Sequence, residues 1–427
     1  MMITVEEALE MILSYVETLK SVQSPVLSSL GQVLSENITA EVDIPPRDNS
    51  SMDGYALQAR DTAGASPNRP VELAVTGELA AGYVFSDSVS PGSAVRIMTG
   101  APIPSGADAV VPFEDTDEAG RRPPQGTAFT QYTVRVLKDA RPGDCIRRAG
   151  EDMRRGETVL TRGRTLRPQE IGVLASLGKE SVRVVRRPVV AILSTGDELT
   201  PLGQPLAPGK IYDSNAYSIA ALVTRCGGTP KLLGIARDTV GDLTATIRNG
   251  LSGADMLVTS AGVSRGDYDV VKEVLAREGE VAFWTVAMKP GKPLAFGRFH
   301  HNGRSIPHLG LPGNPVSSMV SFELFGRPAI FKMLGKSEWR RPILRAVAVE
   351  PIINRDDPRR FYARCIVTQR EDGRYYVSLT GAQGSGILTS MAAANALTVI
   401  PEDVDEVKPG EELDVMMLDW SHGEEWR

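Results

Sequence analysis

The sequence predicts a multidomain α/β plus β protein, in which a central doubly wound parallel-sheet domain is flanked by two small β domains and a mixed N-terminal domain. The chain has 427 residues, more than a single hydrophobic core usually serves. Strand and helix patterns alternate from residue 189 to residue 334, as is typical of a parallel sheet. Short β-rich runs separated by Gly, Pro, Asp and Ser occur on both sides of that region, as expected for small β domains.

The N-terminal region begins with a helix signal. Thr4 and Glu7 form a capping box, and the apolar residues that follow at helical spacing predict an amphipathic helix of about four turns. Residues 55–138 alternate short β-rich runs with turn clusters and predict an all-β domain. Pro168 suits the first position of a second helix, which ends before Gly178.

The central region carries the clearest pattern. Residues 189–193 form an apolar run bounded by a turn, as a buried parallel strand does. Asp213, Ser214 and Asn215 cap a helix that ends near Cys226. Further strands are predicted at 231–236, 256–260, 282–288, 294–297 and 308–311, and further helices at 243–250, 268–278 and 316–334.

These patterns divide the chain into five segments. We expect a mixed N-terminal domain in two parts, a small β domain, a central α/β domain and a C-terminal β-barrel domain. Their respective ranges are 1–46 with 140–186, then 47–139, 187–335 and 336–427.

Charge and composition exclude several function classes. The net charge of −6 argues against a nucleic-acid surface. Cys145, Cys226 and Cys365 have no metal-ligand or redox spacing, and their odd number fits a reducing cytosol. The N-terminus lacks a signal-peptide pattern, and the apolar runs are far shorter than the roughly 20 residues that span a bilayer. We therefore expect a cytoplasmic protein that binds neither nucleic acid nor membrane.

Polar and glycine-rich loops follow the predicted central strands. Ligands of an open parallel sheet bind at the carboxyl ends of its strands, so we expect these loops to meet at one edge. They are residues 194–198 (STGDE), 237–238 (RD), 260–269 (SAGVSRGDYD), 289–293 (KPGKP) and 312–315 (PGNP).

Each of these loops suits an anionic ligand. Backbone N–H groups at loop-to-helix junctions bind phosphate and other oxyanions, and Lys289 and Lys292 add positive charge. Four carboxylates beside them suit a hard cation such as Mg²⁺: Asp197, Glu198, Asp238 and Asp269. The residues alone predict a phosphorylated ligand with a divalent cation.

Simpler structural roles stay open for the single motifs. Asp197 or Asp269 taken alone is equally a helix cap, and KPGKP and PGNP taken alone are turn sequences. Residues 52–55 suit a β-turn and residues 99–100 a bulge. The coincidence of five such loops at one edge favours a binding site.

Long motifs along the chain resemble the signature of the molybdopterin molybdenumtransferases, a family that includes the C-terminal domain of gephyrin. In the central region they are residues 194–199, 213–215, 262–264, 266–269, 289–293 and 311–317. Elsewhere they are residues 48–56 (DNSSMDGYA), 96–102 (RIMTGAP), 106–111 with Glu114, 150–152 (GED), 385–388 and 390–392. One departure is Ala261, where the family commonly has glycine; alanine is unfavourable there if the position requires a positive φ.

The resemblance implies an elongated four-domain homodimer whose central domain is of the molybdopterin-binding type. Its substrates would be adenylylated molybdopterin and molybdate, and its products the molybdenum cofactor and AMP, with Mg²⁺ assisting cleavage of the pyrophosphate bond. The molybdopterin adenylyltransferase is a further candidate partner.

The resemblance and the loops together assign the candidate site residues. Catalytic roles are expected for Asp53, Glu198, Asp238, Asp269, Lys289 and Lys292, and metal binding for Asp197, Glu198 and Asp269. Substrate binding is expected for Thr99, Glu114, Asp152, Thr195, Gly196, Ser214, Asn215, Ser260, Gly262, Ser264, Pro312, Gly313 and Pro315. In the family arrangement Asp53, Thr99 and Glu114 complete the site from the partner subunit.

Two other function classes remain open. One is an interaction scaffold, for which gephyrin is the precedent, although a scaffold would need neither the acidic nor the lysine loops. The other is an enzyme of the same fold that uses another nucleotide or pterin, or that inserts tungstate, because tungstate and molybdate have nearly the same size and charge.

Overall fold

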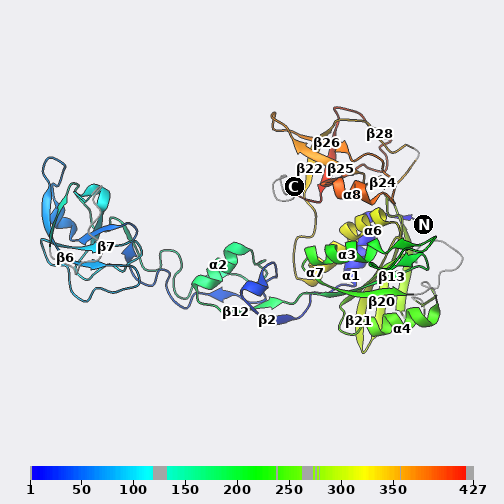
Figure 1. The fold of residues 1–427 in the computed structure, drawn as a ribbon, viewed down its shortest axis with the longest axis horizontal. Helices are drawn as coiled ribbons and strands as arrows, with labels where there is room; N and C mark the ends of the chain where they lie inside the picture. The colour runs from blue at the N-terminus through cyan, green and yellow to red at the C-terminus, as the bar shows by residue number, and fades with distance from the viewer. Residues whose placement is uncertain are drawn as a thin grey trace. The chain divides into compact units, whose positions relative to one another are not determined.

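A computed structural model of the chain describes residues 2–118, 132–236, 239–261, 273–274, 277, 279–355 and 357–419. The chain divides into two compact units, whose elements are labelled in Figure 1. The first contains Met1–Ser24, Ser28–Ser35 and Arg183–Arg427, and the second contains Pro25–Leu27 and Glu36–Val182. Each unit has its own sheets and hydrophobic cores.

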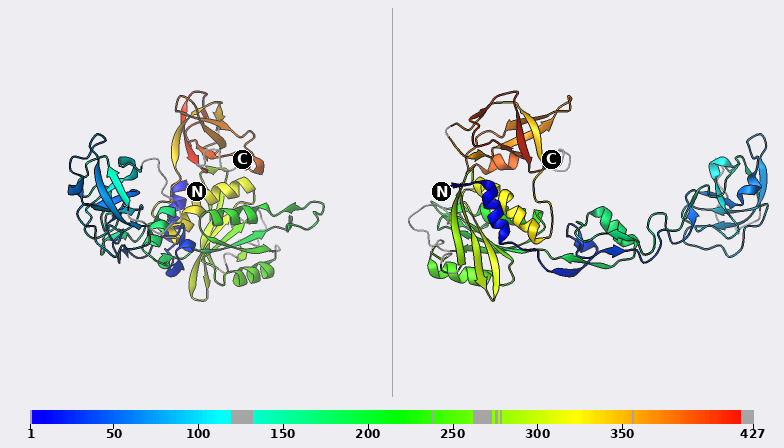
Figure 2. Two further views of the ribbon diagram at one scale, coloured as in Figure 1. Left: turned by 60° about the vertical axis from the view of Figure 1, so that its left-hand side comes forward. Right: turned by 180° about the vertical axis from the view of Figure 1, so that it is seen from behind.

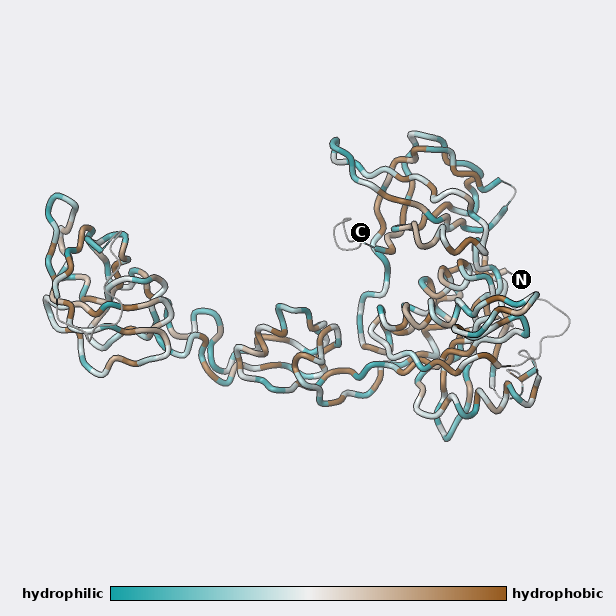
Figure 3. The backbone as a smooth tube through the Cα atoms, viewed as in Figure 1, coloured by the Kyte–Doolittle hydropathy of each residue, from teal (hydrophilic) through white to brown (hydrophobic). Residues whose placement is uncertain are grey.

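A seven-stranded sheet is the centre of the first unit. In spatial order its strands are β1 (Met2–Ile3), β18 (Gly279–Val286), β20 (Pro293–His301), β21 (Arg304–Leu311), β17 (Met256–Ser260), β13 (Val189–Thr195) and β16 (Thr229–Ala236). Strand β13 pairs in parallel with β16 and β17, and β17 pairs in parallel with β21. The predicted apolar run of β13 is buried except at Val189, its first residue. Figure 3 shows apolar residues along the strands of this sheet.

Strand β20 departs from the predicted parallel order, because it is antiparallel to both of its neighbours. It is joined to β21 by Asn302 and Gly303, which have φ values of 50° and 72°. Two residues with positive φ form the turn of a tight hairpin, which is too short for the crossover that a parallel pair needs. The other long strands keep one direction, since β18 and β21 each run opposite to β20.

Helices cover both faces of the sheet, as a doubly wound fold requires. Helix α1 (Val5–Ser14) begins with the predicted capping box of Thr4 and Glu7. It is shorter than predicted, because the chain leaves the helix after Tyr15 and the Leu19 N–H donates to the carbonyl of Met333. The remaining helices are α3 (Ser214–Arg225), α4 (Val240–Gly250), α6 (Pro315–Ser321) and α7 (Arg327–Met333). The predicted helix 268–278 falls largely outside the described residues.

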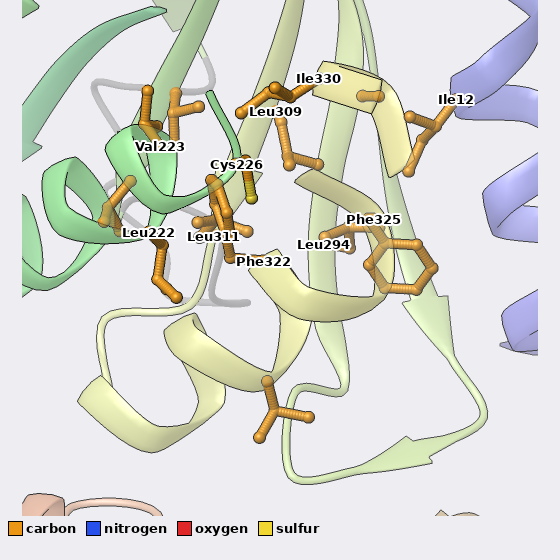
Figure 4. Packing of buried hydrophobic residues seen from close by; sticks show 14 of the residues in the cluster. Ile12, Leu222, Val223, Cys226, Leu294, Leu309, Leu311, Phe322, Phe325 and Ile330 are labelled. Atoms are coloured by element: carbon orange, nitrogen blue, oxygen red, sulfur yellow. The ribbon is translucent and has the colours of Figure 1, made fainter. Parts of the chain in front are cut away.

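The predicted helix 316–334 is present as one helical run, in which the π turn η4 (Phe322–Gly326) joins α6 to α7. It packs beside α1 and α3 on one face of the sheet, and Figure 2 shows α1 next to α7. Figure 4 shows the buried side chains of this core, including Ile12, Leu222 and Phe325. Helix α4 covers the other face through Leu243 and Ile247.

The last part of the first unit is a closed five-stranded barrel, as predicted. Its strands are β22 (Ile343–Ala348), β26 (Tyr375–Leu379), β25 (Arg364–Gln369), β27 (Ala396–Val399) and β29 (Glu412–Met417), and helix α8 (Leu388–Ala393) precedes β27. Two short pairs, β19 (Met288–Lys289) with β24 (Arg360–Phe361) and β23 (Ile352–Ile353) with β28 (Glu406–Val407), involve the segments beside these strands. A third pair, β14 (Leu199–Thr200) with β15 (Ile211–Tyr212), lies between β13 and α3 in the central domain. Arg341 ties the barrel to the helical layer, because it donates to buried Glu323 at 2.8 Å and to the Leu418 carbonyl at 2.7 Å.

The second unit contains the predicted small β domain. Its five-stranded sheet has the order β8 (Ala109–Pro112), β5 (Gly54–Leu57), β7 (Ser93–Ile97), β6 (Val71–Leu79) and β9 (Tyr132–Val136). Helix α2 (Pro168–Ser176) begins at the predicted proline. The shorter elements are β3 (Ile38–Thr39) with β11 (Thr158–Leu160), β4 (Asn49–Ser50) with β10 (Ile146–Arg147), and the 3₁₀ turns η2 (Ala59–Thr62) and η3 (Phe113–Asp115). Strands β2 (Ser21–Pro25) and β12 (Ser181–Val185) and the turn η1 (Leu27–Ser29) include residues of both units.

None of the helices that the structure describes is both long enough and apolar enough to cross a bilayer.

A neutral histidine is sealed in the centre of the sheet. His308 on β21 is fully buried, its Nε2 lies 3.0 Å from the Thr259 hydroxyl, and its ring meets Phe299 edge-on. Burial lowers the pKa of His308 to about 3, because the imidazolium would lose its hydration.

We predict that His308 weakens the central sheet as the pH falls below about 6.5, the pKa of histidine in an unfolded chain. Between that value and 3 the unfolded chain binds a proton that the folded chain does not. From pH 7 to pH 5 the H308L variant should therefore lose about 2 kcal/mol less stability than wild type. Hydrogen exchange of β17 and β21 amides measures this difference, with exposed H300L as the control. Equal pH dependence of wild type and H308L would contradict the prediction.

Candidate functional site

The carboxyl ends of β13, β17 and β21 open onto a cleft of about 670 Å³. The strand directions therefore bring the described parts of the predicted loops, at 194–198, 260–261, 289–293 and 312–315, to one edge. Residues 237–238 and 262–269 lie outside the described residues. The residues singled out in the sequence that line this cleft are Thr195, Glu198, Ser214, Asn215, Ser260, Pro312, Gly313 and Pro315. The lining also contains residues that the motifs did not single out as site residues: Leu199, Ile211, Tyr212, Asp213, Ala261, Pro293, Asn314, Ser317 and Gly386.

Asn215 joins three of these loops. The Asp213 carboxylate caps α3 by accepting the Ala216 N–H at 3.1 Å, and this places Asn215 in the first turn. The Asn215 Nδ2 donates to the Ser260 hydroxyl and to the Gly313 carbonyl, both at 2.7 Å. Its Oδ1 is buried and has no hydrogen-bond partner among the described residues. A fixed amide with a spare acceptor suits a ligand that offers an N–H or O–H group.

The loop after β13 is shaped by Gly196. This residue has a φ of 138°, and a Cβ there would lie 2.4 Å from the Glu198 carboxylate. Glycine therefore lets Glu198 fold back over the loop and line the cleft. The side chain of Asp197 is exposed, and its backbone carbonyl accepts a hydrogen bond from the Lys210 ammonium group.

The two predicted lysines differ in their surroundings. The Lys289 ammonium lies 3.4 Å from the Asp357 carboxylate, 3.3 Å from Asn354 Oδ1 and 4.6 Å from the centre of the Phe361 ring. Arg359, and to a lesser degree Lys289, hold the pKa of Asp357 below its usual range. Lys292 is exposed and precedes Pro293, which lines the cleft. Lys289 therefore already has a carboxylate partner in the barrel segment, whereas Lys292 has no ion-pair partner among the described residues.

The barrel supplies one wall of the cleft through a loop that a buried arginine holds. Arg364 is fully buried, and it donates to the carbonyls of Gln383 and Gly384 and to the Ser390 hydroxyl, each at 3.0 Å. The next residue in this loop, Ser385, accepts the Val316 N–H through its carbonyl and the Asn314 amide through its hydroxyl. The sequence signal for Arg364 is a lone charge within an apolar strand.

The second unit brings two further predicted residues together. The Asp53 Oδ1 accepts hydrogen bonds from the backbone N–H and the hydroxyl of Thr99, both at 2.7 Å. These hydrogen bonds hold the pKa of Asp53 below its usual range, so an exposed carboxylate is fixed in its ionised form. Glu114 is exposed in η3, next to Phe113, whose N–H donates to the Asp53 carbonyl. Asp152 is exposed, and its N–H donates to the Ile44 carbonyl.

Four predicted site residues lie outside the described residues: Asp238, Gly262, Ser264 and Asp269. The proposed metal-ligand set therefore remains a prediction. In the part of the chain that the structure describes, no three His, Cys, Asp or Glu residues gather in a metal-binding arrangement. Glu198 and Asn215, two of the described residues that line the cleft, nonetheless offer oxygen ligands of the hard type that Mg²⁺ prefers.

Comparisons with known proteins agree along the whole chain. Residues 3–178 match the MoeA N-terminal region (domain I and II), residues 191–332 a probable molybdopterin binding domain, and residues 348–418 the MoeA C-terminal region (domain IV). Molybdopterin molybdenumtransferase 2 of Mycobacterium tuberculosis H37Rv is 38% identical over 97% of this chain and 99% of its own. The molybdopterin molybdenumtransferase of Bacillus subtilis is 36% identical over 93% and 90%.

A solved structure agrees with the fold. The molybdopterin biosynthesis MoeA protein of Pyrococcus horikoshii OT3 superimposes with a TM-score of 0.76 at 30% identity, covering 98% of this chain and 100% of that one.

We predict that A261G stabilises the central domain. Ala261 has a φ of 74°, which lies in the left-handed region, and its N–H donates to the Leu311 carbonyl at 3.1 Å. A side chain there costs roughly 1 kcal/mol, and glycine removes this strain. Urea unfolding should show a higher midpoint for A261G, whereas A220G within helix α3 should lower the free energy of unfolding by up to about 1 kcal/mol. A lower midpoint for A261G would show that the backbone is not strained at this position.

Proposed function

Because the chain belongs to the molybdopterin molybdenumtransferase family, we propose that it inserts molybdate into adenylylated molybdopterin and releases AMP, giving the molybdenum cofactor. The observation that carries the proposal is the cleft at the carboxyl edge of the sheet. It combines an apolar wall of Leu199, Ile211 and Tyr212 with the fixed, unpartnered acceptor of Asn215. An apolar wall with few oriented polar groups suits a flat heteroaromatic ring that carries N–H donors.

The chain's own residues would hold the substrate and control its charge. Backbone N–H groups near Thr195 and in the predicted 262–264 loop would bind the pyrophosphate. Lys292 would neutralise the pterin phosphate or the molybdate. Lys289 would do the same only by exchanging its Asp357 partner for the anion. No nucleophilic side chain is required, because stabilising the developing charge promotes cleavage of the pyrophosphate bond.

We propose that the metal is Mg²⁺ and that Asp197, Glu198, Asp238 and Asp269 would bind it directly or through water. Glu198 supports this assignment because its carboxylate lines the cleft. When bound, Mg²⁺ would polarise a phosphoryl oxygen and stabilise the leaving group.

We propose further that the protein acts as a homodimer and that Asp53, Thr99 and Glu114 serve the cleft of the partner subunit, while Asp152 contributes to substrate binding. The Asp53–Thr99 pair supports this role, since it presents a fixed, ionised carboxylate at an exposed turn. Such a carboxylate suits an interaction with a metal ion or with a substrate N–H group.

We expect purified protein to release AMP from adenylylated molybdopterin only when molybdate and Mg²⁺ are both present, with active cofactor formed. Chromatographic measurement of AMP, with each component left out in turn, tests this. Release without molybdate, or with tungstate alone, would point to another reaction of the same fold. Tight pterin binding without any release would instead indicate a scaffold.

We predict that mixed dimers will restore activity between variants of the two units. If each site uses Asp53 from one subunit and Lys292 from the other, D53A and K292A are each inactive as homodimers. Co-expression gives heterodimers with one intact site, so activity should return to about one quarter of wild type. Co-expressed K292A and E198A, which both change the same unit, should restore nothing. Recovery in neither mixture, or in both equally, would contradict a shared site.

A further inference from the structure

A second cleft of about 670 Å³ lies at the opposite, amino edge of the central sheet. It is bounded by the C-terminal end of α1, the segment after that helix, and the residues at the starts of β13, β17 and β21. Four cations line it, Lys20, Arg186, Arg298 and Arg304, against two carboxylates, Glu17 and Asp255. The proposed transfer reaction uses none of these residues.

The buried Asp255 carboxylate holds the arginine side chains of this cleft in place. Its side chain is only 1% exposed, and its two oxygens accept four hydrogen bonds. Oδ1 accepts from Arg186 at 2.6 Å and from Arg304 at 2.7 Å. Oδ2 accepts from Arg186 at 2.6 Å and from the Val189 N–H at 2.9 Å. The carboxylate therefore fixes two guanidinium groups side by side, and the hydrogen bonds that it accepts come from the protein itself.

Arg304, Arg298 and Lys20 keep donors that no described residue accepts. Arg304 uses only one Nη in its bond to Asp255, and its side chain is 48% exposed. Arg298 lies 5.4 Å from the centre of the Tyr15 ring, and it pairs with Glu280, which is not part of the cleft lining. Among the described residues, the Lys20 ammonium has no ion-pair partner.

We propose that this cleft binds a small phosphorylated molecule through its phosphate monoester group. Planar guanidinium groups held in place by a carboxylate match the oxygens of a phosphate, and a recess lined by positive charge concentrates small anions. The apolar part of the lining consists of Tyr15, Leu19, Pro307 and Met333. It gives an apolar body of the ligand a surface to pack against.

Phenyl phosphate is a suitable probe, because it joins a dianion to an aromatic ring. Calorimetric titration of the full-length protein should detect its binding, and phenol, which lacks the phosphate, should bind at least 10-fold more weakly. The double variant K20Q/R298Q leaves the Asp255 hydrogen bonds intact and should weaken phenyl phosphate binding by about 10-fold or more. R345Q, which changes an exposed arginine of the barrel, is the matched control and should bind like wild type.

The cleft at the carboxyl edge also suits anions, so K292Q separates the two sites. Binding that survives in K292Q and is lost in K20Q/R298Q supports the proposal. Wild-type affinity in K20Q/R298Q, loss of all binding in K292Q, or no binding at millimolar phenyl phosphate would overturn it. A soaked crystal with phosphate density at Arg298 and Arg304 would support it independently.

Discussion

The parallel pairing of buried strands is the constraint on which the rest of the first unit depends. Strands β16, β13, β17 and β21 run in one direction, so their carboxyl ends share one edge of the sheet and their amino ends share the other. The first edge collects the loops that carry Thr195, Ser260 and Gly313, and the second collects Arg186, Asp255 and Arg304. Both clefts are therefore consequences of strand direction before any side chain is considered.

Strand direction brings the loops to the same edge, and buried polar side chains then fix the positions of those loops. The Asn215 amide ties the ends of β17 and β21 to the start of α3, Arg364 holds the barrel loop around Gly384, and Asp255 holds two guanidinium groups. A buried polar group that loses its partner pays its full desolvation cost. The hydrogen bonds of each of these residues therefore stabilise one conformation of the segments that they join.

The elements that were predictable from the sequence are those whose cause is local. The capping box of Thr4 and Glu7, the Asp213 cap of α3 and the buried strand beginning at Val189 each follow from neighbouring residues. The Asn302–Gly303 turn is equally local, and it explains the one strand direction that alternation of strands and helices misses. The cleft lining followed from the loop motifs because parallel strands align their ends.

Other features depend on partners far away in the chain. Lys289 pairs with Asp357, and Arg364 binds carbonyls of residues 382–384, so neither arrangement can be inferred from adjacent sequence. The sequence predicts strain at Ala261 only if its φ is positive, and the structure gives that angle as 74°.

The π turn Phe322–Gly326 sets the rotation of α6 relative to α7 about the axis of their shared helical run. On its N-terminal side α6 contributes Pro315 and Ser317 to the cleft, and on its C-terminal side α7 packs against α1. A π turn holds one residue more than an α turn, and one residue corresponds to about 100° of helical rotation. Deleting a single residue here would relax the helix yet rotate one half against the other, so the binding face and the packing face would no longer be in register. The extra residue of the π turn therefore matters for the direction in which the two helix faces point rather than for the length of the helix.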